Sequence, residues 1–439
     1  MALAAVAAPA AQARLQGVRV AIGVPLEEGL FDGSVRWPSG QHVAIDAPAA
    51  EDPDVLVVPV DPRAGGRHVV TWRGLGRDGH PSRGEVAFGV RDGTTGRSAA
   101  TERDVPLGRD LVLGLGRLLA LAGLLGTAGL VILRATVVGP AWRAGGVTPP
   151  VGVPDTAAFR ERTGPPLAAA AATWWAAWWA LAAAAAAGLV LTPLALLWIG
   201  GRGPGDAGRL LADTRWGTAW IVQAVALAAA AGAAGVLARG ASGRSPELAP
   251  AWALALAGPP AVALVAISFS GHAAGTDDPR LNIAIDAIHN LATAAWLGGL
   301  AGLAVLLPAA LRPLGAGDRT RLAAGVVVRF SALALTAVGL LVATGVYRAL
   351  VELPSPGDLL DTGYGNALLI KLVVFVPLLG VGAYNRLALH PRLERAAIGL
   401  DPDDRGAAAR LRTSVRAELA LAGALMVAVA ALVALAPPT

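Results

Sequence analysis

The residues of this chain best suited to chemistry are two imidazoles beside long apolar segments. His272 lies in SGHAA at 270–274 and His289 in IHNL at 288–291, and the whole chain has only six histidines and no cysteine. Imidazole nitrogen is a ligand that suits copper, zinc, iron and nickel. An ionisable side chain at membrane depth is costly, so it marks a functional site by default. These histidines therefore indicate a metal-binding or redox site at a membrane.

Polar side chains surround His289 at helical spacing. Positions three and four apart share a face of a helix, and the following fall on one stripe: Asp286, His289, Asn290, Thr293 and Trp296. A polar stripe in a membrane helix is expected to face the bundle interior or a water-filled cavity. His272, Asp277 and Asp278 precede it, which predicts a funnel of imidazole and carboxylate groups. Spacing alone leaves another interpretation open, in which His289 is a structural hydrogen bonder between helices and His272 an interfacial cap.

Lys371 and His390 are two further residues whose places in the protein can be predicted. Lys371 lies in a later apolar segment at a depth similar to that of His289, and we expect it to pair with Asp286 or to extend toward the membrane surface. His390 falls in a polar connection between apolar segments, and we expect it to be a surface residue with little effect on function.

Composition places these residues in a membrane protein. The chain has 439 residues, of which 55% are hydrophobic and 15% charged, against about 25% charged in soluble domains. Residues 1–108 are mixed, whereas residues 109–439 alternate apolar runs with short Arg-rich loops. Loop arginines account for the net charge of +5, so we expect no nucleic-acid partner. Without cysteine, thiolate metal sites are excluded, and no phosphate-binding loop or hydrolase motif occurs, so we expect no enzyme.

Eight segments are long and apolar enough to span a membrane, since about 20 residues are needed. They are residues 110–133, 168–199, 216–238, 250–270, 283–310, 322–346, 365–388 and 414–436. If the N-terminal domain lies outside, the loops on the inner side hold sixteen arginines and the loops on the outer side hold five. Because cytoplasmic loops are enriched in Arg and Lys, this predicts a multi-pass protein of the bacterial inner (plasma) membrane. Its N-terminal domain would lie outside the cytoplasm.

The N-terminal region has the patterning of strands. Alternating apolar residues over 17–92 predict a small extracytoplasmic β-sandwich. Its Asp-Gly turn carries Asp78 and His80, whose spacing lets a carboxylate and an imidazole converge on one metal ion. Residues 1–13 resemble the end of a secretory signal, although an Ala-rich unstructured segment is an equal interpretation.

These motifs resemble two families. HVVTWRGLGRDGHPSRGEVAFGV at 68–90 is similar to the C-terminal part of CopC-type copper-binding domains. The stretches SGHAA at 270–274, IHNLATAAWLGGL at 288–300, RFSALALTAVGLLVATGVY at 329–347 and YGNALLIKLVVFVPLLGVGAYNR at 364–386 resemble the CopD copper-resistance family. The predicted organisation is a signal-like segment (1–13), a truncated CopC-like β-sandwich (14–95), a linker (96–109) and a CopD-like membrane domain (110–439).

The resemblance implies copper, of uncertain valence, as the bound ion. CopC-type domains hold Cu(II) with an N-terminal histidine and the Asp and His of the turn, which Asp78 and His80 match. The N-terminal histidine has no counterpart here, and His42 or His68 would have to substitute. In the CopD-like part the resemblance implies His272 and His289 as membrane copper ligands.

Three functions remain open at this point. The resemblance favours copper binding and transport across the inner membrane, expected as import, with a contribution to copper homeostasis and resistance. A b-type haem protein with His272 and His289 as axial ligands is a second hypothesis. A third is a non-transporting protein that delivers copper to a partner such as a periplasmic chaperone or an oxidase.

Overall fold

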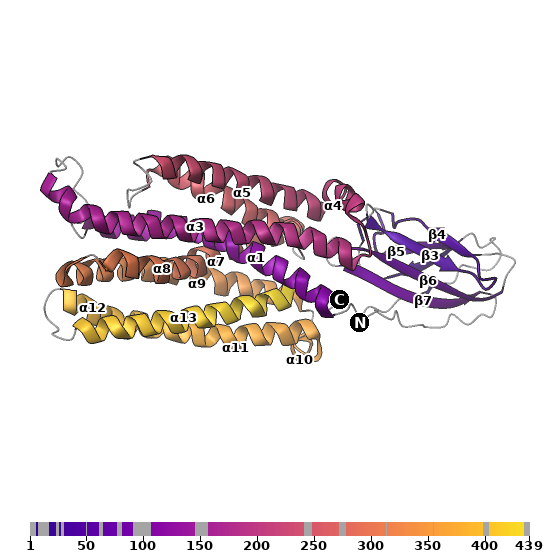
Figure 1. The fold of residues 1–439 in the computed structure, drawn as a ribbon. Helices are drawn as coiled ribbons and strands as arrows, with labels where there is room; N and C mark the ends of the chain where they lie inside the picture. The colour runs from indigo at the N-terminus through magenta and orange to yellow at the C-terminus, as the bar shows by residue number, and fades with distance from the viewer. Residues whose placement is uncertain are drawn as a thin grey trace.

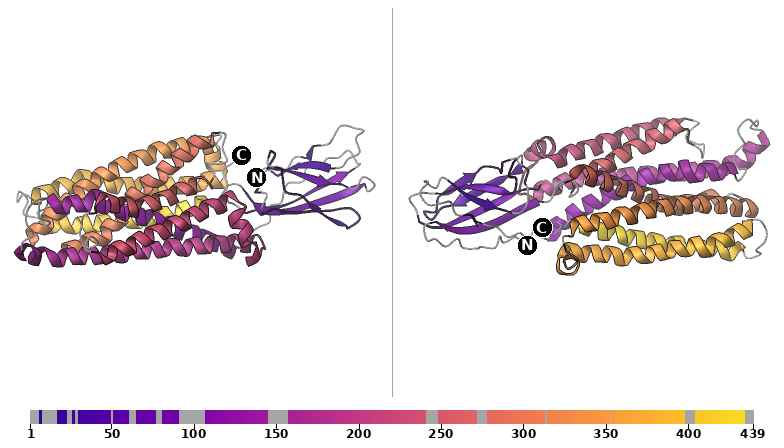
Figure 2. Two further views of the ribbon diagram at one scale, coloured as in Figure 1. Left: turned by 90° about the horizontal axis from the view of Figure 1, so that it is seen from above. Right: turned by 180° about the vertical axis from the view of Figure 1, so that it is seen from behind.

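A β domain and a long helical bundle lie end to end (Figures 1 and 2). The computed structural model describes residues 6–7, 17–22, 26–27, 30–49, 51–60, 65–76, 81–90, 107–144, 157–240, 248–271, 278–312, 314–353, 355–397 and 404–433. We call the end of the bundle that carries the β domain the β-domain end, and the opposite end the far end. The predicted architecture, a small β domain before a helical membrane domain, is confirmed.

The β domain is built from two antiparallel sheets with the strand orders β1-β2-β5 and β4-β3-β6-β7. Val20 and Leu56 of the first sheet and Val35, Val70 and Trp72 of the second belong to a single buried core. The strands are β1 (Val6–Ala7), β2 (Gly17–Ala21), β3 (Asp32–Arg36), β4 (His42–Ile45), β5 (Val55–Pro59), β6 (Gly66–Leu75) and β7 (Pro81–Val90). Alternating aliphatic residues predicted β2, β5, β6 and β7 but gave no sign of β3 and β4.

Strands β6 and β7 form a hairpin in which Leu75 pairs with Pro81. Residues 77–80 of the intervening turn, including the predicted ligands Asp78 and His80, lie outside the described residues. So do residues 91–106, and the boundary between the two domains therefore stays a prediction. Val6 and Ala7, within the segment predicted to be signal-like, pair with β2.

Eight helical segments of the described chain are long and apolar enough to cross a membrane, as predicted. Helix α1 is central, since it packs against α3, α6, α8 and α13. The α-helices are α1 (Leu107–Leu133), α2 (Gly139–Ala144), α3 (Ala157–Ile199), α4 (Ala207–Ala212), α5 (Arg215–Arg239), α6 (Pro250–Ser268), α7 (Pro279–Thr293), α8 (Gly299–Leu311), α9 (Ala316–Glu352), α10 (Asp358–Asp361), α11 (Gly363–Tyr384), α12 (His390–Ala397) and α13 (Asp404–Val433). Short π-helical turns η2 (Arg134–Val138), η6 (Ala294–Gly298) and η7 (Asn385–Leu389) and the 3₁₀ turn η3 (Pro204–Asp206) interrupt or join them.

Small residues let α1 approach its neighbours closely. A Cβ atom added at Gly129 would lie 2.3 Å from the carbonyl oxygen of Ala294 in η6, and one at Gly188 of α3 would lie 2.2 Å from the backbone nitrogen of Ala120. Helix contacts in membranes depend on such small residues because lipid tails are as apolar as the helix side chains. The glycines thus position α1 directly against the helix that carries His289.

One arginine that sequence patterning assigned to a loop lies inside the bundle. Arg134 is buried in η2, where its guanidinium carbon stands 4.4 Å from the ring centroid of Trp174. A cation over the face of an aromatic ring is stabilised by the ring quadrupole. The apolar run of the first span therefore continues past this residue to Ala144 instead of ending at residue 133.

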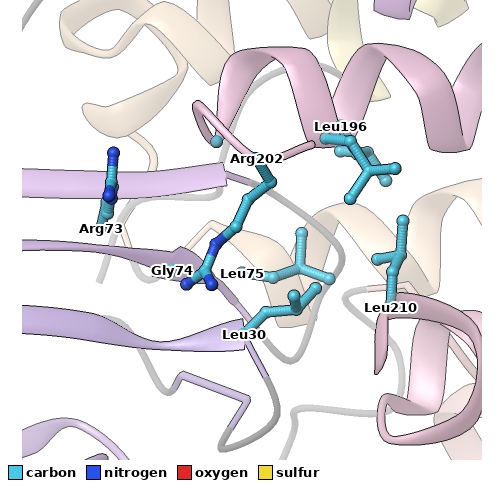
Figure 3. A pocket seen from close by; sticks show the side chains of 9 residues that line it. Leu30, Arg73, Gly74, Leu75, Leu196, Arg202 and Leu210 are labelled. Atoms are coloured by element: carbon cyan, nitrogen blue, oxygen red, sulfur yellow. The ribbon is translucent and has the colours of Figure 1, made fainter. Parts of the chain in front are cut away.

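The β domain contacts the bundle through a small apolar cluster. Leu30 and Leu75 of the β domain share it with Leu196 and Leu210 of α3 and α4. Figure 3 shows these leucines around a cavity of about 30 Å³, into which Arg202 extends from the end of α3 toward β6. A Glu27 carboxylate oxygen also accepts a hydrogen bond from the backbone nitrogen of Arg215, at 3.2 Å, where α5 begins. The membrane-facing end of β6 is therefore held against α3–α5.

Candidate functional site

The helix that carries the predicted stripe begins with a side-chain cap. Asp278 accepts a hydrogen bond at 3.3 Å from the backbone nitrogen of Leu281, and Pro279 occupies the first turn. An Asp cap followed by Pro is a strong helix start. His289 is ten residues beyond Pro279, so it lies roughly 15 Å along the helix. Asp278 therefore has a structural role as the cap of α7, and its contribution to the predicted funnel stays a prediction.

His289 points into the bundle, toward α9. Its Nδ1 atom lies 2.9 Å from the hydroxyl oxygen of Thr344. That hydroxyl has one hydrogen, which it donates at 2.6 Å to the carbonyl of Leu340. With that hydrogen on the carbonyl, the threonine oxygen accepts from His289, an arrangement in which the imidazole proton is on Nδ1 and the lone pair on Nε2. A neutral imidazole held in this tautomer is the form that ligates metals.

A chain of charged groups lies beside His289 at the β-domain end. Asp286 of α7 forms an ion pair with Arg348 of α9. Arg348 also donates to Glu352 at 2.8 Å, and the Tyr364 hydroxyl of α11 donates to the other Glu352 oxygen. Asp286 is only 8% exposed, so this pairing compensates a charge that burial would otherwise penalise.

Of the two alternatives predicted for Lys371, the pairing with Asp286 does not occur, and extension toward the membrane surface stays a prediction. Arg348, which patterning placed in a loop, takes the position expected for Lys371. Among the described residues no carboxylate lies within ion-pair distance of Lys371. The carboxylates that balance the charge of Lys371 therefore lie beyond ion-pair distance. Arg348, and not Lys371, pairs with Asp286 because of how α9 is rotated about its axis, which depth in the membrane does not reveal.

The rest of the stripe also faces other helices. Asn290 donates at 3.2 Å to Asp286 and at 3.4 Å to the hydroxyl of Ser268 in α6. Thr293 donates to the carbonyl of His289 at 2.8 Å, one turn earlier in the same helix. Trp296 stands edge-on to Phe375 of α11, with ring centroids 5.9 Å apart. The stripe thus lines the space between α6, α9 and α11.

The described residues do not form a complete metal site. Within them no group of three or more His, Asp or Glu side chains could hold a metal ion. His272 and Asp277, the loop ligands predicted above α7, lie outside the described residues. His289 is accordingly one donor that needs partners from elsewhere, and the roles of Asp78, His80, His272 and His289 as ligands stay predictions.

Burial decides the roles of two other histidines. His68 is fully buried in the β domain, stacked on Phe88 at 5.4 Å, so it is unsuited to replace an N-terminal ligand. His390 was expected at the surface but is buried, and its Nδ1 accepts a hydrogen bond of 2.7 Å from Arg386. His42, by contrast, is exposed on β4.

Sequence reasoning missed the acidic and basic residues contributed by α9 and α13. Arg348 and Glu352 stand four apart at the end of a long apolar run, and this i, i+4 spacing is itself a sign of an ion pair on a helix. Glu418 is an acid within the apolar segment Thr413–Ala430, and it is buried. Glu418 already falls within the predicted span 414–436, whereas Arg348 and Glu352 join a span only when the end of 322–346 is set further out.

Two family models match the chain in the order that the motifs predicted. The CopC domain model matches residues 6–91, and a model described as "Copper resistance protein D" (CopD) matches residues 324–432. The two matches support a CopC/CopD fusion.

Two curated relatives carry names that refer to copper. The chain is 39% identical over 124 residues, 28% of its own length and 22% of the relative's, to "Copper transport protein CutJ" of Bacillus subtilis (strain 168). It is 28% identical over 216 residues, 48% of its length and 64% of the relative's, to "Copper resistance protein D" of Pseudomonas syringae pv. tomato. The chain thus spans less than two thirds of the length of either relative. No solved structure matches it.

Proposed function

We propose that this chain binds copper at the β-domain end of its bundle and carries it across the bacterial inner membrane into the cytoplasm. The observation that carries the proposal is the His289 imidazole, oriented by Thr344 so that Nε2 bears the lone pair, inside a CopD-type bundle. The predicted second imidazole, His272, belongs to the loop that joins α6 to α7 at the same end. Copper accepts imidazole readily, and two such donors would form the core of an entry site.

The β domain supports the same direction of movement. Its β6 strand ends against α3 and α4, and Asp78 and His80 follow directly in the sequence. A copper ion held by Asp78 and His80 would be bound within a few residues of the strand end that contacts the bundle. Handing the ion from the turn to His289 requires no other protein, although a periplasmic chaperone could load the turn.

The driving force need not be chemical. No nucleotide-binding motif occurs in the sequence, and an inside-negative membrane potential favours cation entry by about 2.3 kcal/mol per charge per 100 mV. Asp286 and Glu352 lower the electrostatic cost of a cation entering beside Arg348 and Lys371, because they balance those two positive charges.

Loss of His289 tests the proposal directly. We expect His289→Ala to abolish copper uptake into vesicles that contain the protein. It should also lower the copper content of the purified full-length protein to the amount that Asp78 and His80 hold. The readouts are metal analysis and a copper-sensitive dye enclosed in the vesicles, with Cu(I) and Cu(II) supplied separately.

The matched control is His390→Ala, which removes a buried imidazole from α12, away from the proposed site, and should leave both readouts unchanged. Wild-type copper content and uptake in His289→Ala would contradict the proposal. Copper binding without uptake in the wild type would favour a delivery protein, and a Soret band in the purified protein would favour haem.

A further inference from the structure

A second polar cluster lies toward the far end of the bundle, away from the site described above. Glu418 of α13 packs against the backbone of α11, where a Cβ atom added at Gly382 would lie 3.6 Å from a Glu418 carboxylate oxygen. The residue is only 8% exposed. An acidic side chain buried among membrane helices is a functional-site candidate.

The hydrogen-bond partners of Glu418 are neutral. The hydroxyl of Ser414 lies 2.5 Å from the Asn385 side-chain oxygen and donates to it. The Asn385 side chain also lies beside the Glu418 carboxylate. With its oxygen occupied, the asparagine has its NH₂ group left to donate to the carboxylate. Asn385 begins the π-helical turn η7, a local widening of the helix that is frequent at functional sites.

No cation compensates Glu418 in the described part of the chain. Helices α1, α8, α11 and α12 and the turn η7 pack against α13. On these elements and on α13 itself, the structure describes the titratable side chains of Arg117, Tyr364, Lys371, Tyr384, Arg386, His390, Arg392, Arg395, Arg410 and Arg416. The side chains of Arg109, Asp110, Glu394, Asp404, Arg405 and Arg412 lie outside the described residues. None of the described side chains forms an ion pair with Glu418. An ionised carboxylate here would have an amide donor and no counter-charge, which burial penalises strongly.

We propose that Glu418 is a proton-binding site that makes copper movement depend on pH at the cytoplasmic face. This rests on the proposed function, in which the far end faces the cytoplasm. One O–H bond forms on the carboxylate with a proton from water on that side, and the same bond breaks when the proton returns. The ligand is a proton and not copper, because the cluster offers only oxygen donors and the amide oxygen is already bonded, whereas copper favours nitrogen and sulfur.

Glu418→Gln tests the site while keeping the shape of the side chain. In vesicles with a copper-sensitive dye inside, wild-type uptake should change with interior pH by up to about tenfold per pH unit, the limit for one titrating group. Glu418→Gln should transport copper at a rate that does not vary with interior pH. Glu51→Gln, the same change at an exposed acid of the β domain, should keep the wild-type response.

A second measurement does not need copper transport. Infrared difference spectra of the full-length protein, recorded as pH changes, should show a carboxylic-acid C=O band that Glu418→Gln lacks and Glu51→Gln retains. If that band appears but vesicles take up no copper, the proposed function fails and the proton site stands. A band that persists in Glu418→Gln, or an unchanged pH response of its uptake, would overturn the inference.

Discussion

The two ends of the bundle treat buried acids differently. At the β-domain end, Asp286 and Glu352 share the guanidinium of Arg348. Toward the far end, Glu418 has the neutral partner Asn385 and no ion pair within the described residues. A cation compensates the first pair of carboxylates next to the proposed copper entrance, whereas the second carboxylate has no such partner and is the proposed proton site. In the two proposals above, buried carboxylates attract a copper ion at the β-domain end and exchange a proton toward the far end.

Removing the shared cation should have the largest effect. We expect Arg348→Ala to lower the free energy of unfolding by about 3–5 kcal/mol, because it leaves two buried carboxylates without their partner. Unfolding of the purified protein in detergent, followed by denaturant titration, measures this loss. Arg321→Ala is the control, since it breaks the exposed ion pair with Asp318, which is worth about 0–1 kcal/mol. Equal losses in both variants would show that the network at the β-domain end is not energetically special.

Loosening the imidazole should have an intermediate effect confined to the β-domain end. Thr344→Val keeps the side-chain volume but removes the hydroxyl that orients His289. Loss of such a supporting contact costs about 10–100-fold in metal affinity, which competition titration with copper chelators would detect. Thr336→Val is matched to it, because the Thr336 hydroxyl donates only to Ala332 in its own helix. An affinity loss of the same size in both variants would argue against a positioning role for Thr344.

The smallest effect is expected toward the far end. Ser414→Ala removes the hydroxyl that donates to Asn385, a neutral hydrogen bond worth about 1 kcal/mol. The same denaturant titration measures it beside Arg348→Ala. A loss as large as that of Arg348→Ala would mean that the two ends do not differ in the way described here.

Apolar length made the bundle predictable, and rotation made the site harder to predict. Runs of about 20 apolar residues reveal spans directly, and the stripe around His289 follows from helical spacing. Asp286 and Arg348, however, are 62 residues apart. Whether Arg348 or Lys371 pairs with Asp286 depends on the rotation of α9 and α11 about their helix axes. Both helices are largely apolar, so their sequences have little polar periodicity from which that rotation could be predicted.

The β domain shows a similar limit. Strands β2 and β5 carry alternating aliphatic residues, a pattern that predicts a half-buried strand. Strand β3 has the sequence DGSVR with a single aliphatic residue, and its place in the sheet comes from pairing with β4 and β6. Pairing between strands that are far apart in the sequence cannot be predicted from the residues of one strand, so a strand such as β3 is missed by pattern analysis.

The contact of Glu27 with the start of α5, together with the leucines beneath it, makes the two domains mechanically continuous. Because these contacts join the β domain to α3 and α5, we expect a tilt of either helix to shift the end of β6. The β domain is attached to one side of the bundle, at α3, α4 and the start of α5, and we expect it to move with these helices. A fluorophore on its distal edge would therefore register rearrangements deep in the lipid bilayer, where no water-soluble probe can be placed.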